Sequence, residues 1–210
     1  DNSVLYIGGA ISSVGEGVTR VHNLVKFTPD GIYDPGFVSN IGDNLDTAEC
    51  LLCPYVWNLV LSPDGSTLYV GGYFEIIDGQ TRKNLAALDP NTGSLKPFNP
   101  DVSDFGVVYA MAITSDGKTL YIGGRFTTVG GQARSRLAAI DTATGTVTSF
   151  NPDITPRYDN MDCIDCANVW DLVLSPDDKI LYVGGYFTGI GGQIRYNLAA
   201  ADTATGIVLA

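Results

Sequence analysis

The sequence predicts an all-β protein, a β-propeller made of four-stranded antiparallel blades, and three observations lead to this prediction. A string of the form LYxGG occurs four times, starting at Leu5, Leu68, Leu120 and Leu181. The chain has 25 glycines and 11 tyrosines, and only 17% of its residues are charged, which is typical of strands and tight turns. Between the strings, short apolar runs alternate with turns that contain Gly or Pro.

The second repeat illustrates the four strands that we expect in each blade. VWNLVL, at 56–61, is continuously apolar, as in an inner strand that is buried on both faces, and the Ser-Pro-Asp-Gly after it is a tight turn. TLYVGGYF, at 67–74, has paired glycines that indicate a bulge or a close backbone approach. NLAALD, at 84–89, is the third strand. SLKPFN, at 94–99, contains a proline and therefore suits the outer edge of a sheet.

Repetition of whole four-strand units is expected of a propeller and is not needed in a sandwich. The spacing of the strings alternates long, short and long, because insertions with cysteines precede only the second and the fourth. We therefore expect a single array over residues 1–210 that consists of two copies of a two-blade unit. The expected blade boundaries are near 1–54, 55–106, 107–167 and 168–210.

The first blade lacks its inner strand, because Asp1 aligns with Asp64 in the turn that follows that strand. Three explanations stay open. The chain could be cut from a longer array, it could form an open or four-bladed ring, or a neighbouring chain could supply the strand.

The repeats resemble a known family in three segments. GGRFTTVGGQARSRLAAIDTATGTVTSFNP at 123–152 and GGYFTGIGGQIRYNLAAADTATG at 184–206 are similar to the delta-60 type of propeller repeat, and so is FTPDGIYDPGF at 27–37. Ile11, in place of the phenylalanine of the other repeats, departs from the pattern. The resemblance covers essentially the whole chain. It implies an extracellular or cell-surface bacterial scaffold of the kind found in adhesin-like or matrix-like proteins, without an established common chemistry.

The net charge of −11 argues against nucleic acids and anionic membranes as partners, since both require clustered Lys or Arg. The sequence has no run of 18 apolar residues, so we expect no membrane insertion. An acidic surface is compatible with bound cations, with cationic partners or with solubility alone.

An arginine recurs at a nearly fixed distance after each LYxGG string. A ring of such guanidinium groups could bind carboxylates or sugar acids. We favour a structural interpretation, an inter-blade latch to an aspartate such as Asp89, Asp141 or Asp202, because a ligand site usually breaks the symmetry of the repeats. The arginines are Arg20, Arg82, Arg134 and Arg195.

Two aligned insertions each contain a C-x-x-C pair, Cys50 with Cys53 and Cys163 with Cys166. We favour local disulfides that shape the loops in an oxidising compartment. Disulfides between the loops, a Cys₄ zinc site and a redox dithiol stay open, because the sequence alone does not give the connectivity.

Acidic residues beside these cysteines suggest calcium, because carboxylates on turns are hard oxygen ligands. Aspartate is also common in turns for local hydrogen bonding, so we favour solvated turns and expect no cofactor, with calcium as the alternative. The candidate ligands are Asp46, Glu49, Asp159, Asp162 and Asp165.

Three aromatic residues, Tyr55, Trp57 and Trp170, could stack on sugar rings. Because Trp57 and Trp170 lie within the inner-strand pattern, we expect these two rings to fill space between blades instead.

Catalytic motifs are scarce, and His22 is the only histidine. The leading hypothesis is a non-enzymatic extracellular structural protein of a bacterial surface, matrix, biofilm or filament, which self-associates and could polymerise by strand exchange. One alternative is a glycan-binding, adhesive propeller module. The other is a polysaccharide hydrolase or lyase, since a glycosidase needs only two carboxylates.

Overall fold

The computed structural model describes residues 4–11, 13–14, 19–20 (backbone only), 23–42, 54–103, 106–155 and 167–210. All regular secondary structure in these ranges is strand. The chain divides into two compact units, Asp1–Asn99 and Pro100–Ala210. Each unit contains two of the four LYxGG strings.

Most strands are short, and the strands of each unit form separate sheets. The strands of the first unit are β1 (Leu5–Gly8), β2 (Ser13–Val14), β3 (Thr19–Arg20), β4 (Leu24–Phe27), β5 (Ile41–Gly42), β6 (Tyr55–Leu61), β7 (Leu68–Tyr73), β8 (Ile76–Ile77), β9 (Gln80–Thr81) and β10 (Leu85–Leu88). Those of the second unit are β11 (Val107–Ile113), β12 (Thr119–Arg125), β13 (Thr128–Val129), β14 (Gln132–Ala133), β15 (Leu137–Asp141), β16 (Ile154–Thr155), β17 (Asn168–Leu174), β18 (Ile180–Tyr186), β19 (Gly189–Ile190), β20 (Gln193–Ile194) and β21 (Leu198–Asp202).

Each of the last three repeats forms one three-stranded antiparallel sheet with the LYxGG strand in the middle. The strand orders are β6–β7–β10, β11–β12–β15 and β17–β18–β21, and the first repeat has only β1–β4. The outer segment, expected as a fourth strand, is reduced to one bridge per repeat, for example Leu88 with Leu95. After Lys96 N–H donates to the Ala87 carbonyl, Pro97 has no N–H with which to continue the ladder.

The paired glycines accommodate a β-bulge in the inner strand, as the sequence suggested. The register shifts between Val56 and Asn58 in β6, and β11 and β17 shift at the equivalent residues. A Cβ added to the second glycine of the pair would overlap the carbonyl oxygen of the bulged strand. Only glycine fits at these three positions, Gly72, Gly124 and Gly185.

The sequence analysis missed a second group of small sheets. The GGQ segments form β-hairpins, such as β19–β20, with both turn residues at positive φ (Gly191 at 58° and Gly192 at 74°), which is the geometry of a type I′ turn. The last segment of the preceding repeat then pairs with the hairpin, giving β5–β8–β9 and β16–β19–β20. These sheets tie consecutive repeats together within each unit.

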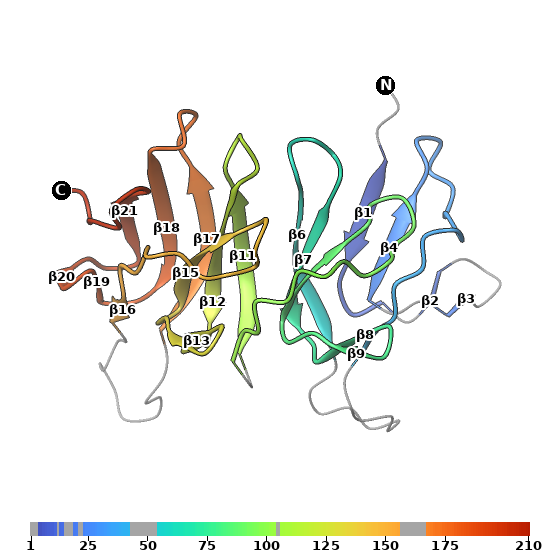
Figure 1. Cartoon of the computed structure of the whole chain (residues 1–210), viewed down its shortest axis with the longest axis horizontal. Helices are drawn as coiled ribbons and strands as arrows, with labels where there is room; N and C mark the ends of the chain where they lie inside the picture. The colour runs from blue at the N-terminus through green and yellow to red at the C-terminus, as the bar shows by residue number, and fades with distance from the viewer. Residues whose placement is uncertain are drawn as a thin grey trace. The chain divides into compact units, whose positions relative to one another are not determined.

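The core of each unit lies between the two sheets that contain its LYxGG strands, and Figure 1 labels the strands of these sheets. In the second unit, Tyr121 of β12 and Leu137 of β15 belong to the same buried cluster as Leu181 and Val183 of β18. The first unit has the equivalent cluster, with Tyr6, Leu24, Leu68 and Val70.

Candidate functional site

The recurrent arginines that the structure describes contact the backbone of their own repeat. Arg134 donates from Nη2 to the Thr148 carbonyl at 2.7 Å and from Nη1 to the Ala133 carbonyl at 2.8 Å. Arg195 makes the equivalent bond to the Leu209 carbonyl at 3.2 Å, and Arg82 donates to the Thr81 carbonyl at 2.8 Å.

These arginine contacts differ from the expected ion pairs between blades. Arg134 and Arg195 join the small hairpin to the outer segment of the same repeat, whereas the Arg82 bond is to the adjacent residue. The acceptors of these bonds are carbonyl oxygens. The side chain of Arg20 lies outside the described residues.

The aspartates that were expected to pair with these arginines hold their own turns. In the third repeat, Asp141 accepts bonds from the N–H and the Oγ1 of Thr144, both at 2.8 Å. The hydroxyl and N–H of Thr144 lower the pKa of Asp141. Asp202 has the same arrangement with Thr205, and Asp89 accepts from the backbone of Thr92 and Asn91. The pKa values of both are also lowered.

A second set of aspartates stabilises the turns before the second, third and fourth LYxGG strands. The Ser62 hydroxyl donates to Asp64 at 2.6 Å, and the Ser66 N–H donates at 3.0 Å. These bonds lower the pKa of Asp64 to about 2. The Lys118 N–H and the Thr114 hydroxyl lower the pKa of Asp116 to about 2 in the same way.

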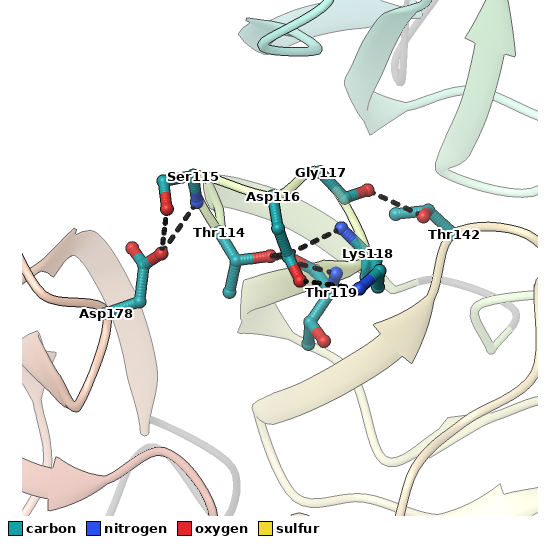
Figure 2. A network of polar contacts seen from close by, with 8 residues as sticks. All are labelled: Thr114, Ser115, Asp116, Gly117, Lys118, Thr119, Thr142 and Asp178. Atoms are coloured by element: carbon teal, nitrogen blue, oxygen red, sulfur yellow. Dashed lines mark hydrogen bonds and ion pairs between the residues drawn. The ribbon is translucent and has the colours of Figure 1, made fainter.

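One residue of this turn also contacts the neighbouring repeat. Asp178 occupies the glycine position of the turn, with φ of 57°. Its carboxylate accepts bonds from the N–H and Oγ of Ser115, as Figure 2 shows. Ser115 lies in the equivalent turn of the third repeat. The Thr142 hydroxyl donates to the Gly117 carbonyl of that turn at 2.7 Å and so connects the turn to the outer part of the third repeat. Sequence analysis missed Asp178, although it breaks the S-P-D-G pattern.

Arg136 is a second contact between repeats that the sequence analysis missed. It is only 4% exposed, and its Nε donates to the Ala167 carbonyl, at the start of the fourth repeat, at 3.1 Å. Its φ is 62°, and the other three repeats have asparagine with positive φ at this position. Asparagine adopts this conformation more readily than most residues. The signal in the sequence was therefore the arginine that precedes L-A-A in the third repeat, where the other repeats have asparagine.

The LYxGG tyrosines also link repeats. Tyr6 donates its hydroxyl proton to the Pro90 carbonyl at 2.7 Å, and Tyr121 donates to the equivalent Thr203 carbonyl at 3.3 Å. Burial is the main reason that the pKa of each tyrosine is raised. Each bond runs from the first repeat of a unit to the second.

The inner-strand aromatics are more exposed than expected. Trp57 and Trp170 are 55% and 49% exposed, which contradicts the expectation that they fill space between blades. Trp170 stacks on Tyr109 of the adjacent inner strand with ring centroids 4.3 Å apart, and Trp57 lies 6.2 Å from Tyr55. The bulges present Trp57, Tyr109 and Trp170 at equivalent positions.

Several candidates lie outside the described residues. These are the four cysteines, His22 and the proposed calcium ligands Asp46, Glu49, Asp159, Asp162 and Asp165. Within the described ranges, no group of three or more His, Cys, Asp or Glu side chains is placed to hold a metal ion. In those same ranges, no helix has the length and apolar character needed to cross a membrane.

The architecture is that of an all-β protein of small antiparallel sheets arranged as sequence repeats. Residues 114–146 match the family described as "Domain of unknown function (DUF5122) beta-propeller", which supports a β-propeller fold. Comparison with curated protein sequences gives no match.

Two of the solved structures that match this chain are an enzyme and a set of WD40 repeats. Hydrazine synthase of Kuenenia stuttgartiensis is 18% identical, with a TM-score of 0.46, over 80% of this chain and 38% of that chain. The RRP9 WD40 repeats are 15% identical, with a TM-score of 0.47, over 82% of this chain and 40% of that chain. The chain thus spans about two fifths of the length of these structures.

Proposed function

We propose that this chain is a non-enzymatic structural protein of the bacterial cell surface or extracellular matrix, which self-associates into an assembly or filament. In this proposal its four repeats are propeller blades of the delta-60 type, and the outer bridged segment of each is the fourth strand. The observation that carries the proposal is the use of the recurrent Asp and Arg side chains. In the described residues they bond to the backbone of their own turns and sheets.

This use of polar groups favours a scaffold. A ligand site needs charged groups directed to a common point, whereas these carboxylates accept bonds from the N–H and hydroxyl groups of adjacent residues. The contacts made by Asp178 and Arg136 add stiffness between repeats. The acidic net charge of −11 would keep such a scaffold soluble before it assembles.

The proposal is tested by electron microscopy of native material in negative stain, together with sedimentation of the purified chain over a range of concentrations. We expect ordered assemblies and a sedimentation coefficient that rises with concentration. Isolated monomers in both measurements would reject the structural role.

A glycan-binding, adhesive function is a second candidate, because Trp57 and Trp170 are half exposed and an aromatic face can stack on a sugar ring. A titration of the chain with neutral oligosaccharides, followed by tryptophan fluorescence, tests it. Binding should be saturable and should be lost in Trp57→Ala or Trp170→Ala. An unchanged fluorescence spectrum with every sugar would exclude this function.

A further inference from the structure

Four Asp-Gly pairs occur in the chain, and an Asp-Gly pair can form isoaspartate without an enzyme. In this reaction the glycine nitrogen bonds to Cγ of a protonated aspartate, the nitrogen loses its proton, and one carboxyl oxygen leaves as water. Water then opens the cyclic imide, either at Cγ, which restores aspartate, or at the main-chain carbonyl carbon, which gives isoaspartate. Glycine favours the reaction because no side chain hinders its nitrogen. The pairs are Asp30-Gly31, Asp64-Gly65, Asp78-Gly79 and Asp116-Gly117.

The glycine nitrogen of one pair differs from the other three. The N–H groups of Gly31, Gly65 and Gly117 each donate to the carbonyl three residues earlier, at 2.9, 2.8 and 2.8 Å. Gly79 is exposed at the tip of the β8–β9 hairpin with φ of 74°, and its N–H has no acceptor among the described residues. Because the nitrogen must lose its proton to react, a hydrogen bond from the N–H slows the other three pairs.

The carboxylate of Asp78 also keeps one oxygen available to leave. Both of its bonds go to Oδ1, from the Asn40 N–H at 2.9 Å and from Asn40 Nδ2 at 3.0 Å. Asp64 by contrast is held at both oxygens, since the Ser66 N–H donates to Oδ1 at 3.0 Å and the Ser66 hydroxyl donates to Oδ2 at 2.9 Å. The Asp64 carboxylate is therefore kept ionised and in place, whereas Oδ2 of Asp78 can take up a proton.

Asp116 is protected as Asp64 is. The Lys118 N–H donates to its Oδ1 at 3.0 Å, and the Lys118 ammonium group lies 3.2 Å from its Oδ2. The pKa of Asp64 and that of Asp116 are both about 2, which reduces the protonated fraction from which water can leave. The side chain of Asp30 makes no such bond within the described residues, so this pair is protected only at its glycine N–H.

We propose that Asp78-Gly79 is a site of spontaneous isoaspartate formation, and that it reacts faster than the other three pairs in the folded chain. The proposal is independent of the structural function proposed above. The reaction needs no oxidant or cofactor, because the water that leaves is replaced by the water that opens the ring. The described hairpins of the third and fourth repeats have Gly130-Gly131 and Gly191-Gly192 at this turn, so they have no carboxyl group that could react.

Isoaspartate at residue 78 would weaken the β5–β8–β9 sheet, which connects the first two repeats. It adds one methylene group to the main chain in a two-residue turn whose residues both have positive φ. It also moves the carboxylate that accepts the Asn40 N–H, and it displaces the Asp78 N–H, which donates to the Asn40 carbonyl at 3.0 Å. The β5–β8–β9 sheet should therefore lose stability as the protein ages, whereas β16–β19–β20 should keep it.

The test is prolonged incubation of the folded full chain near neutral pH, followed by proteolysis and mass spectrometry with electron-transfer fragmentation, which distinguishes isoaspartate from aspartate. We expect isoaspartate at residue 78 to accumulate at least about fivefold faster than at residues 64 and 116, which is the rate ratio that one broken hydrogen bond gives. Residue 30 should be intermediate. In urea the four rates should converge, because the hydrogen bonds that separate them are lost. The proposal is overturned if residue 78 is not the fastest in the folded chain, or if the same order persists in urea.

Asp78→Gly is the matched control for the effect on stability. It gives the hairpin the Gly-Gly turn of the third and fourth repeats and removes the reacting carboxyl group. Incubation should lower the melting temperature of the wild-type chain more than that of Asp78→Gly. Equal losses in the two proteins would reject the predicted weakening of the β5–β8–β9 sheet.

Discussion

The carboxylate of Asp178 accepts two hydrogen bonds from Ser115, from its N–H at 2.7 Å and from its Oγ at 2.6 Å. Asp178 has the positive φ that Gly65 and Gly117 have in the equivalent turns. An aspartate adopts this conformation less readily than glycine. Its side chain in turn provides a polar contact between the third and fourth repeats.

We expect the Asp178–Ser115 pair to show a measurable coupling. Asp178→Asn keeps a residue that tolerates positive φ but removes the charge, and Ser115→Ala removes the hydroxyl donor. Because the pair is partly solvated, the coupling energy should be about 0.5–1 kcal/mol. Urea unfolding of the two single variants and of the double variant measures it. Strictly additive effects would show that the pair does not contribute.

The two glycines of the fourth LYxGG string should respond differently to alanine. Gly185→Ala should destabilise the protein by about 3 kcal/mol, because the added Cβ would overlap the Asn168 carbonyl. At Gly184 the nearest atom to an added Cβ is Asp171 Cβ at 3.8 Å, so Gly184→Ala should change stability by less than about 1 kcal/mol. Thermal unfolding of both variants tests this. Equal destabilisation would contradict the close approach at Gly185.

Arg136→Ala should destabilise the protein by about 2 kcal/mol, because it leaves the Ala167 carbonyl without this donor and puts alanine at positive φ. Arg136→Asn should cost less, since asparagine is the residue of the other three repeats and tolerates this φ. Guanidinium unfolding curves for the two variants give the comparison. An Asn variant less stable than the Ala variant would refute this explanation.

Acid should weaken the fold between about pH 4 and pH 2. The turn aspartates have a folded pKa below the ordinary value of 3.8, and for Asp64 and Asp116 it is about 2. A lowered folded pKa contributes stability that is fully present above the unfolded pKa and is lost as the pH falls through the folded pKa. The melting temperature should therefore be flat just above this window and fall within it. Asp116→Asn should reduce the fall, and a constant melting temperature down to pH 2 would contradict the prediction.

The proposed extracellular location predicts that the four cysteines are oxidised in native material. If both C-x-x-C pairs form local disulfides, reduction should raise the intact mass by two hydrogens per bridge. Proteolytic cleavage of the unreduced protein between the two insertions would then leave each local bridge within one peptide, whereas a disulfide between the loops would join two peptides. An unchanged intact mass with reductant would exclude all of the disulfide arrangements.

The local signals in the sequence predicted the strands and turns well. The apolar run of β6, the LYxGG strand and the NLAALD strand lie where expected, and Gly65 has the positive φ that its turn requires. The small hairpins could have been found, because a D-G or G-G pair flanked by apolar residues indicates a type I′ turn.

Other features could not be read locally. The exposure of Trp57 and Trp170 depends on what packs beside the inner strands, which strand periodicity does not report. The bonds of Asp178 and Arg136 join residues 63 and 31 positions apart. A single sequence gives no pairing information over such distances, and only the broken repeat pattern marked these residues.

The first glycine of a LYxGG string limits how close the next inner strand can lie. A Cβ at Gly123 would overlap Val169 of the following inner strand, as one at Gly8 would overlap Val56. The two repeats of a unit can therefore keep this distance only while the position has no side chain. In a library of random variants, both positions should reject every residue except glycine.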